Sequence, residues 1–464
     1  MVPLHRHQPD EHADALSIRP QFALIDEVPE VRRFRLGSEP LPRDVAYQIV
    51  HDELLLDGSA RLNLATFVTT WMEPEGERLM AECASKNLID KDEYPRTAEL
   101  ERRCVSILAD LWHATAEAAT GCSTTGSSEA CMLAGLALKW RWRQRRQAGG
   151  QASDRPNLVM GANAQVCWKK FCRYWDVEPR LVPVGPDATH LTAEAMTPHC
   201  DANTIAVVAV LGSTFDGTYE PVAKMAAALD RLQRVEGINV PLHVDAASGG
   251  FIAPFLDPDL VWDFRLPRVA SINASGHKYG LVYPGIGWLV WRDASALPDE
   301  LVFSVDYLGG HMPTFALNFS RPGSQIAAQY YNFLRLGFEG YRLVQRTCRD
   351  TARWLAGEIA ALGPFELVST GDGIPAFAFR LRAGAGTGYT VFDVSEHLRI
   401  RGWTLPAYRL PPALDKVAVL RIVVRNGFSR DLAGDLVDDL RRVLERLEAS
   451  PGQPPERYET GFRH

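Results

Sequence analysis

The sequence predicts an α/β fold built on a mostly parallel sheet. Short runs rich in Val, Ile, Leu and Ala are bounded by Gly, Asn and Asp, and longer stretches with helical periodicity separate them. Strands that are apolar throughout and alternate with helices are typical of a parallel sheet covered on both faces. At about 150 residues per domain, the length of 464 residues leaves room for a large core and a second domain.

Strand-like and helical segments alternate from about residue 61 to 340. The predicted strands are NLVMG (157–161), RLVPVG (180–185), TIAVVAVLGS (204–213), VPLHVDAAS (240–248), VASINASG (269–276) and IGWLVWRD (286–293). The predicted helices cover 96–115 and 127–146. A long helical stretch at 324–363, with Gly337 and Gly340 as interruptions, leads out of this region.

Two further regions flank the α/β core. The segment before it is rich in Pro and charge and holds one amphipathic stretch, 43–58. After it, strand-like runs at 374–384 and 417–427 and helical stretches at 389–402 and 431–449 predict a smaller α+β domain. The predicted organisation is therefore an N-terminal arm (1–60), a large domain (61–348) and a small C-terminal domain with a terminal tail (349–464).

Composition narrows the class of protein. A net charge of -7 with 46% hydrophobic residues describes an ordinary globular chain and predicts no nucleic-acid partner. The opening residues carry charge where a signal peptide needs an apolar core, and no run approaches the length of a membrane span, so we expect a cytoplasmic protein. The eight cysteines form no C-x-x-C and no repeated metal-ligand spacing, which predicts free thiols and no metal site.

Polar residues directly after apolar runs mark the candidate site, because ligands of parallel sheets bind beyond the carboxyl ends of the strands. Asp245 ends one predicted strand, and Lys278 follows the next. The segment GSSEA (126–130) opens a helix with two hydroxyls and free backbone amides, which favour a phosphate. Each feature also has a structural interpretation: a turn or cap for Asp245, a loop cation for Lys278, and a plain capping box for Ser127 or Ser128.

The combination of a phosphate site, an acid and a lysine suits pyridoxal 5'-phosphate. The aldehyde of this cofactor needs an amine for a Schiff base, its ring nitrogen needs an acid to stay protonated, and its phosphate needs donors. The chain contains neither G-x-x-x-x-G-K-[ST] nor G-x-G-x-x-G, so a nucleotide is a poorer match for the phosphate site.

Longer motifs resemble a known family. SGHKYG, HVDAASGGF, GSSEACMLAGLALKWRWR, NLATFVTTW, NLIDKDEYPRTAELERRCVSILADLWHA and VDYLGG…FALNFSRPGSQ closely resemble the bacterial and plant glutamate decarboxylases, which are fold-type I pyridoxal-phosphate enzymes. The resemblance runs from about residue 30 to 445. It implies a mostly parallel seven-stranded sheet in the large domain, pyridoxal 5'-phosphate as cofactor and L-glutamate as substrate.

The resemblance also implies roles for individual residues. Lys278 matches the Schiff-base lysine, Asp245 the partner of the pyridinium nitrogen, and His277 completes the catalytic set. The other matches to cofactor-binding positions are Ser127, Ser128, Ser275 and His277 at the phosphate, Ser320 donated to the phosphate by the neighbouring subunit, Gln165 and Ala247 on the two ring faces, and Thr214 beside the ring. The matches to substrate-binding positions are Arg421 for the α-carboxylate, Phe67 in the pocket, and Thr66, Asn87 and Asp90 for the distal carboxylate, the last two reaching across a dimer interface.

Several of these residues have simpler interpretations. Gln165 is also a solvated loop amide, Thr66 and Ser320 are also helix or turn caps, and Arg421 is also a surface cation on a strand. His277 is also a capping or packing histidine. The number and order of the motifs favour the family roles.

The implied reaction is decarboxylation of L-glutamate to 4-aminobutyrate and CO2, with one proton consumed, which suggests a role in acid tolerance. Two anions at close range are costly, so Asp90 beside a substrate carboxylate predicts a shared proton and best activity below neutral pH. The resemblance implies a homodimer as the minimal unit and a hexamer as the full assembly. His464 matches a regulatory histidine that closes the site, and the tail lacks a calmodulin-binding helix.

Two alternatives remain open. Another fold-type I enzyme, a lyase or aminotransferase acting on a related acidic amino acid, would keep Lys278 and Asp245 but lack the distal-carboxylate set. A non-catalytic binding protein on this scaffold would have no use for the lysine. Val210 and the segment VYPGIGW depart from the family pattern and leave the preference among close analogues of glutamate open.

Overall fold

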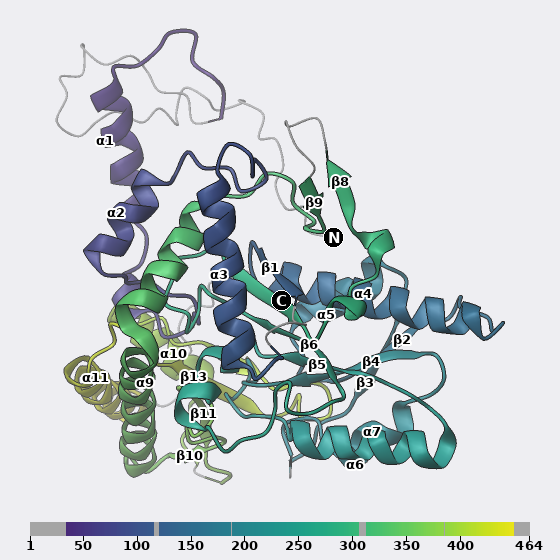
Figure 1. The fold of residues 1–464 in the computed structure, drawn as a ribbon. Coiled ribbons are helices and arrows are strands. Elements are labelled where there is room, and N and C mark those ends of the chain that lie inside the picture. Colours follow the sequence, from purple (N-terminus) through teal and green to yellow (C-terminus); the bar gives the residue numbers. More distant parts are fainter. Residues whose placement is uncertain (1–33, 116–119, 187, 306–311, 385, 450–464) are drawn as a thin grey trace. The chain divides into compact units, whose positions relative to one another are not determined.

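The computed structural model describes residues 34–115, 120–186, 188–305, 312–384 and 386–449 (Figure 1). The chain forms two compact units, Met1–Leu62 and Asn63–His464. In the first, the amphipathic stretch forms helix α1 (Arg43–Leu54). Every candidate site residue in the described ranges belongs to the second unit.

A seven-stranded sheet forms the centre of the second unit, with strand order β1-β7-β6-β5-β4-β2-β3. Its strands are β1 (Thr120–Thr124), β2 (Asn157–Gly161), β3 (Glu178–Val182), β4 (Thr204–Val210), β5 (Leu242–Asp245), β6 (Val269–Ala274) and β7 (Gly287–Trp291). Only β7 runs against its neighbours β1 and β6, and the other pairings are parallel. The predicted α/β class with a mostly parallel sheet is confirmed.

Helices cover both faces of this sheet. Helices α4 (Ser127–Ala148) and α5 (Val166–Tyr174) lie along one face, and α6 (Ala193–Met196) and α7 (Val222–Glu236) along the other (Figure 1). Alternate residues of one strand serve the two layers: Val208 packs with the α4 and α5 cluster, and Val207 with the α7 cluster. Burial on both faces explains the apolar runs of the central strands.

Strand β1 is absent from the predicted strands, because its sequence, TGCST, lacks the apolar run typical of a buried strand. It pairs with β7 at the edge of the sheet. A Cβ atom at Gly121 would lie 2.6 Å from the carbonyl oxygen of Leu289, so the close approach of these strands needs glycine there. Since β1 runs parallel to β6, it delivers the start of α4 to the edge where β5 and β6 end.

A long helix connects this region to a smaller sheet. Helix α9 (Ser324–Ala361) is interrupted at Gly337, whose φ of 56° lies in the left-handed region. The smaller sheet is antiparallel, with order β10-β11-β13-β12, and its strands are β10 (Phe365–Leu367), β11 (Ala376–Leu381), β12 (Ala407–Arg409) and β13 (Ala418–Val423). The predicted domain boundary at 348/349 falls inside α9 and stays a prediction.

The remaining elements complete the second unit. They are helices α2 (Pro74–Glu82), α3 (Pro95–Leu111), α8 (Ala253–Leu256), α10 (Val391–Ile400) and α11 (Arg430–Ala449), and the hairpin strands β8 (Phe303–Val305) and β9 (Met312–Thr314). Within the described ranges, each helix is too short or too polar to span a lipid bilayer.

Candidate active site

Lys278 lies in the loop that follows β6, next to the end of the parallel strand β5. Its ammonium group is 5.5 Å from the centroid of the Phe67 ring. Burial lowers the pKa of Lys278 below its usual value of 10.5, and the Asp245 carboxylate partly opposes that shift. Such an amine loses its proton more readily than a surface lysine and is therefore a better nucleophile.

Buried polar groups of α9 hold the backbone just after this lysine. Gln345 donates a 2.7 Å hydrogen bond to the carbonyl of Tyr279. Gln329 and Tyr341 donate to the carbonyl of Gly280 at 3.1 and 3.0 Å. Both glutamines are fully buried. The sequence does not predict this burial, because helical periodicity alone does not separate an anchoring amide from a surface one.

Asp245 is 4% exposed at the end of β5, and hydrogen-bond donors surround both of its carboxylate oxygens. Oδ2 accepts from Trp168 Nε1 at 2.8 Å and from the Cys131 thiol at 3.7 Å. Oδ1 accepts from Asn273 Nδ2 at 3.1 Å and from the Ala247 amide at 3.2 Å. All four donors are uncharged, so they satisfy the carboxylate without neutralising its charge.

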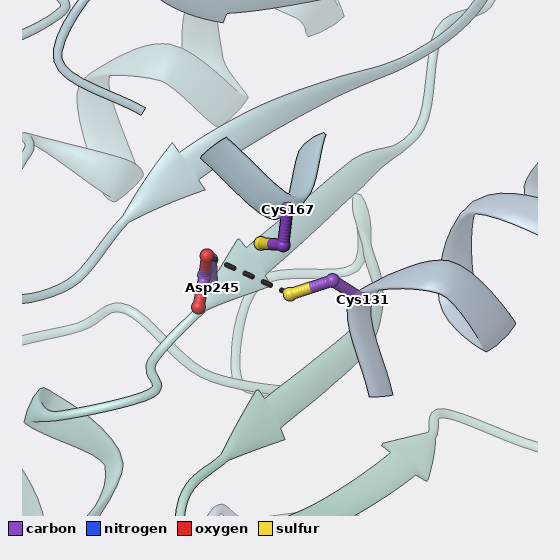
Figure 2. A group of neighbouring side chains, drawn as sticks. All are labelled: Cys131, Cys167 and Asp245. Atoms are coloured by element: carbon purple, nitrogen blue, oxygen red, sulfur yellow. Dashed lines mark hydrogen bonds between the residues drawn. The ribbon is translucent and has the colours of Figure 1, made fainter. Parts of the chain in front are cut away.

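Two thiols converge on Asp245 from different helices. Figure 2 shows Cys131 of α4 and Cys167 of α5 pointing toward the carboxylate. One ligand atom from each of the three residues lies within 4.8 Å of the others, a spacing that could hold a metal ion. The sequence predicts no metal site here, because the two cysteines follow no known metal-ligand spacing. Burial raises the pKa of Cys131 well above its usual value, which favours the thiol as a hydrogen-bond donor to Asp245 over a thiolate ligand.

The start of α4 lies against the loop after β6 and offers groups suited to a phosphate. No side chain among the described residues caps α4, which begins at Ser127 and Ser128. The Ser275 hydroxyl and His277 Nδ1 are buried and have no hydrogen-bond partner in the described structure. A Cβ atom at Gly126 would lie 2.9 Å from His277 Cε1, so glycine lets the helix start approach the imidazole. Backbone amides, the helix dipole and two unpaired polar atoms together fit an anion.

His277 is neutral around pH 7 in the absence of such an anion. Burial, with a smaller contribution from the charge of Lys278, lowers the pKa of His277 to about 4. A bound phosphate would favour the imidazolium and oppose this shift.

Arg421 of β13 and Lys278 lie against the same aromatic ring. The guanidinium carbon is 4.7 Å from the centroid of Phe67 and 5.6 Å from that of Tyr408. Its amino groups donate to the backbone carbonyls of Thr214 and Ala65, the latter at 2.6 Å. Arg421 is 8% exposed, and its buried Nε has no partner among the described residues, so it is not the surface cation of the simpler interpretation.

Asn87 and Ser320 are in contact within one chain. Asn87 donates a 3.3 Å hydrogen bond to the Ser320 hydroxyl and accepts one of 3.1 Å from the Arg321 amide. Ser320 is exposed, as a residue expected to reach a neighbouring subunit must be. Asp90 lies in the same turn, its amide donating to the Asn87 carbonyl at 3.2 Å.

The side chains of two other predicted site residues form hydrogen bonds with nearby backbone amides. Gln165 caps α5 by accepting a 2.6 Å hydrogen bond from the Cys167 amide. The Thr66 hydroxyl accepts from the Val68 amide at 3.1 Å. The contact of Thr66 fits its simpler interpretation as a cap, whereas Gln165 is a helix cap and not the solvated loop amide of its simpler interpretation. The family roles of both residues stay predictions. His464 lies outside the described residues.

Comparison with known proteins fits this geometry. Residues 39–382 match the pyridoxal-dependent decarboxylase conserved domain. The chain is 56% identical over 423 residues to a glutamate decarboxylase of Aliivibrio fischeri, covering 90% of this chain and 91% of the relative. It is 51% identical over 426 residues to one of Solanum lycopersicum, covering 91% and 84%.

Solved structures agree with the sequence relatives. The structure of a glutamate decarboxylase from Lactobacillus brevis superposes with a TM-score of 0.90 at 47% identity, covering 93% of this chain and 99% of that one. A sphingosine-1-phosphate lyase of Burkholderia pseudomallei, at 24% identity and a TM-score of 0.75, shares the fold. The chain belongs to the pyridoxal-dependent decarboxylase family.

Proposed function

We propose that this chain decarboxylates L-glutamate to 4-aminobutyrate and CO2 with pyridoxal 5'-phosphate as cofactor. The observation that carries the proposal is the position of Lys278 and Arg421 against one ring, Phe67, together with the unpaired, buried polar atoms of Ser275 and His277 in the loop of the lysine. The Lys278 amine, suited to the cofactor aldehyde, and the Arg421 guanidinium, suited to a substrate carboxylate, therefore lie close to the same aromatic ring. Relatives named glutamate decarboxylases, at 47–56% identity, support glutamate as the amino acid.

Each candidate residue has a role in this reaction that follows from its chemistry. Ser127, Ser128, Ser275 and His277 would hold the phosphate of the cofactor, and Asp245 would pair with its ring nitrogen. The cofactor, when bound, supplies an electron sink for the bond at the substrate's α-carbon. Arg421 offers a planar fork to the α-carboxylate and fixes its direction, which selects the bond that breaks.

Burial completes the arrangement. The depressed pKa of Lys278 makes its amine available, and apolar walls such as Phe67, 8% exposed, exclude water from the space between amine and guanidinium. When CO2 leaves, the α-carbon takes up one proton, so glutamate plus a proton gives 4-aminobutyrate plus CO2.

The proposal extends to residues of the distal carboxylate and to the assembly. Thr66, Asn87 and Asp90 bind that carboxylate, the last two with Ser320 entering the site of a partner subunit in a homodimer, with a hexamer as the full assembly. Asn87 and Ser320 contact each other, which supports their reaching the same site of the partner subunit. A proton-consuming reaction with best rates below neutral pH supports a role in acid tolerance for a cytoplasmic enzyme, and we propose His464 as the residue that closes the site.

Product analysis tests the function. Purified protein with added pyridoxal 5'-phosphate should release CO2 from L-glutamate and form 4-aminobutyrate in equal amounts, should release far less from L-aspartate, and should work best below pH 7. The variant Lys278→Ala is the control for background decarboxylation. Formation of a 2-oxo acid instead, or CO2 release unchanged by Lys278→Ala, would overturn the proposal.

A further inference from the structure

Asp245 stands at the end of a buried chain of hydrogen bonds that crosses two strands. Ser271 Oγ and His243 Nδ1 are 2.8 Å apart, and His243 Nε2 and Asn273 Oδ1 are also 2.8 Å apart. Asn273 Nδ2 then donates to Asp245 Oδ1 at 3.1 Å. Ser271, His243 and Asn273 are each 0% exposed, so no solvent competes for these bonds.

The donors and acceptors of this chain have one consistent direction. Complete burial lowers the pKa of His243 well below its usual value, so the imidazole is neutral and has a single N–H. Asn273 turns its NH2 to the carboxylate, which leaves its oxygen to accept from His243 Nε2. His243 Nδ1 then accepts from the Ser271 hydroxyl. In this arrangement every donor of the network has an acceptor, and both Asp245 oxygens accept hydrogen bonds.

Trp168 of α5 contacts this hydrogen-bond chain from the helix layer that covers the same face of the sheet. Its indole N–H donates to Asp245 Oδ2 at 2.8 Å, and its ring meets the His243 ring edge to face, with centroids 5.0 Å apart and an interplanar angle of 63°. Trp168 therefore contacts both the Asp245 carboxylate and the His243 imidazole, which is hydrogen-bonded to Asn273. The carboxylate is held at both oxygens, so it cannot rotate without breaking a bond to Trp168 or Asn273.

We propose that Trp168, Asn273 and His243 are positioning residues, which hold the Asp245 carboxylate in one orientation, aimed at the ring nitrogen of the cofactor. This inference rests on the proposed function, because it gives Asp245 its role toward pyridoxal 5'-phosphate. The donors are neutral, so the negative charge of Asp245 stays available to the ring, whereas an arginine or lysine in their place would cancel it. An alternative is that the chain only satisfies buried polar groups of the core.

A pair of matched tryptophan variants separates these two explanations. Trp168→Phe keeps an aromatic ring and removes the donor to Asp245. Trp142→Phe removes an equivalent indole donor, which in the native chain donates to the Ala202 carbonyl at 3.0 Å, from an equally buried ring. A hydrogen bond to a charged group accounts for about a tenfold effect. A second variant, Asn273→Ala, releases the other carboxylate oxygen.

We expect Trp168→Phe and Asn273→Ala each to weaken pyridoxal 5'-phosphate binding by about tenfold and to shift the pH midpoint of the bound cofactor's absorbance, while Trp142→Phe changes neither. In glutamate assays kcat should fall about tenfold with KM within twofold. Equal cofactor affinity and an unchanged absorbance midpoint in Trp168→Phe and Asn273→Ala would overturn the inference. Binding and absorbance are read without amino acid, so they remain decisive even if the chain proves not to act on glutamate.

Discussion

The Thr69 hydroxyl donates a 2.6 Å hydrogen bond to the backbone carbonyl of Lys278, 209 residues later in the chain. The Thr69 amide donates to the neighbouring His277 carbonyl at 2.7 Å. These two bonds tie the segment that contains Thr66 and Phe67 to the loop of the lysine, and so fix the position of the Phe67 ring relative to the reactive amine.

Thr69→Val should loosen this connection. Valine keeps the shape and the amide bond but leaves the Lys278 carbonyl without its hydroxyl donor, which costs about 1–2 kcal/mol in the free energy of unfolding and lowers kcat/KM several-fold. Urea unfolding and steady-state kinetics measure both effects. Thr347→Val, which removes a 2.9 Å bond to the Leu343 carbonyl at an exposed position of α9, is the control. Equal kinetics in the two variants would contradict the connection.

Arg421→Lys should separate substrate binding from cofactor binding. Lysine keeps the charge but loses the planar fork, so KM for glutamate should rise by about 10–100-fold while pyridoxal 5'-phosphate affinity changes little. Arg409→Lys changes an exposed arginine of the same sheet, which donates to the Asp415 carbonyl at 3.1 Å, and should leave KM unchanged. An unchanged KM in Arg421→Lys would remove this residue from the substrate site.

His277 should make the cofactor-free protein less stable in acid. Its pKa is about 4 in the folded chain and 6.5 in the unfolded chain, so the unfolded chain binds the proton first. The stability that this group contributes is complete above pH 6.5 and is lost as pH falls toward 4, by about 1 kcal/mol per pH unit. Urea unfolding at pH 4.5 to 7.5 measures the slope.

The variant His277→Gln should reduce this slope, and His199→Gln should not. Pyridoxal 5'-phosphate should flatten the slope in the unaltered chain, because its phosphate stabilises the imidazolium. Identical slopes with and without cofactor would place the phosphate away from His277.

Asn87→Ala should reveal whether Ser320 serves the cofactor. Without the amide, Ser320 and Arg321 lose two hydrogen bonds that fix their loop, so the dissociation constant for pyridoxal 5'-phosphate should rise about threefold to tenfold. Asn239→Ala, which removes an acceptor of Arg268 at 3.1 Å, is the control. Cofactor affinity equal to that of the control would leave Ser320 without a role at the phosphate.

The strands were predictable where burial on both faces imposes apolar runs, as in the stretch that became β4. Strand β1 was not, because an edge strand of small residues pairs through its backbone and through a glycine contact that only the partner strand reveals. The order of the sheet also depends on pairing between distant residues, which no local pattern contains.

The reactive residues were predictable for a different reason. Asp245 and Lys278 stand at strand ends, where a parallel sheet gathers its ligands. The residues that support them were not predictable. In the sequence, Trp168 has apolar neighbours like any tryptophan of a protein core, and Gln345 fits the helical periodicity like any other residue of its helix. Their roles depend on a single hydrogen bond each, to Asp245 Oδ2 and to the Tyr279 carbonyl, and only the folded chain places those partners together.

Reduction with borohydride in the presence of pyridoxal 5'-phosphate, followed by mass mapping of peptides, tests the central claim most directly. The account predicts one pyridoxyl group per chain, attached to Lys278. Attachment to other lysines with Lys278 unlabelled, or no attachment, would contradict it.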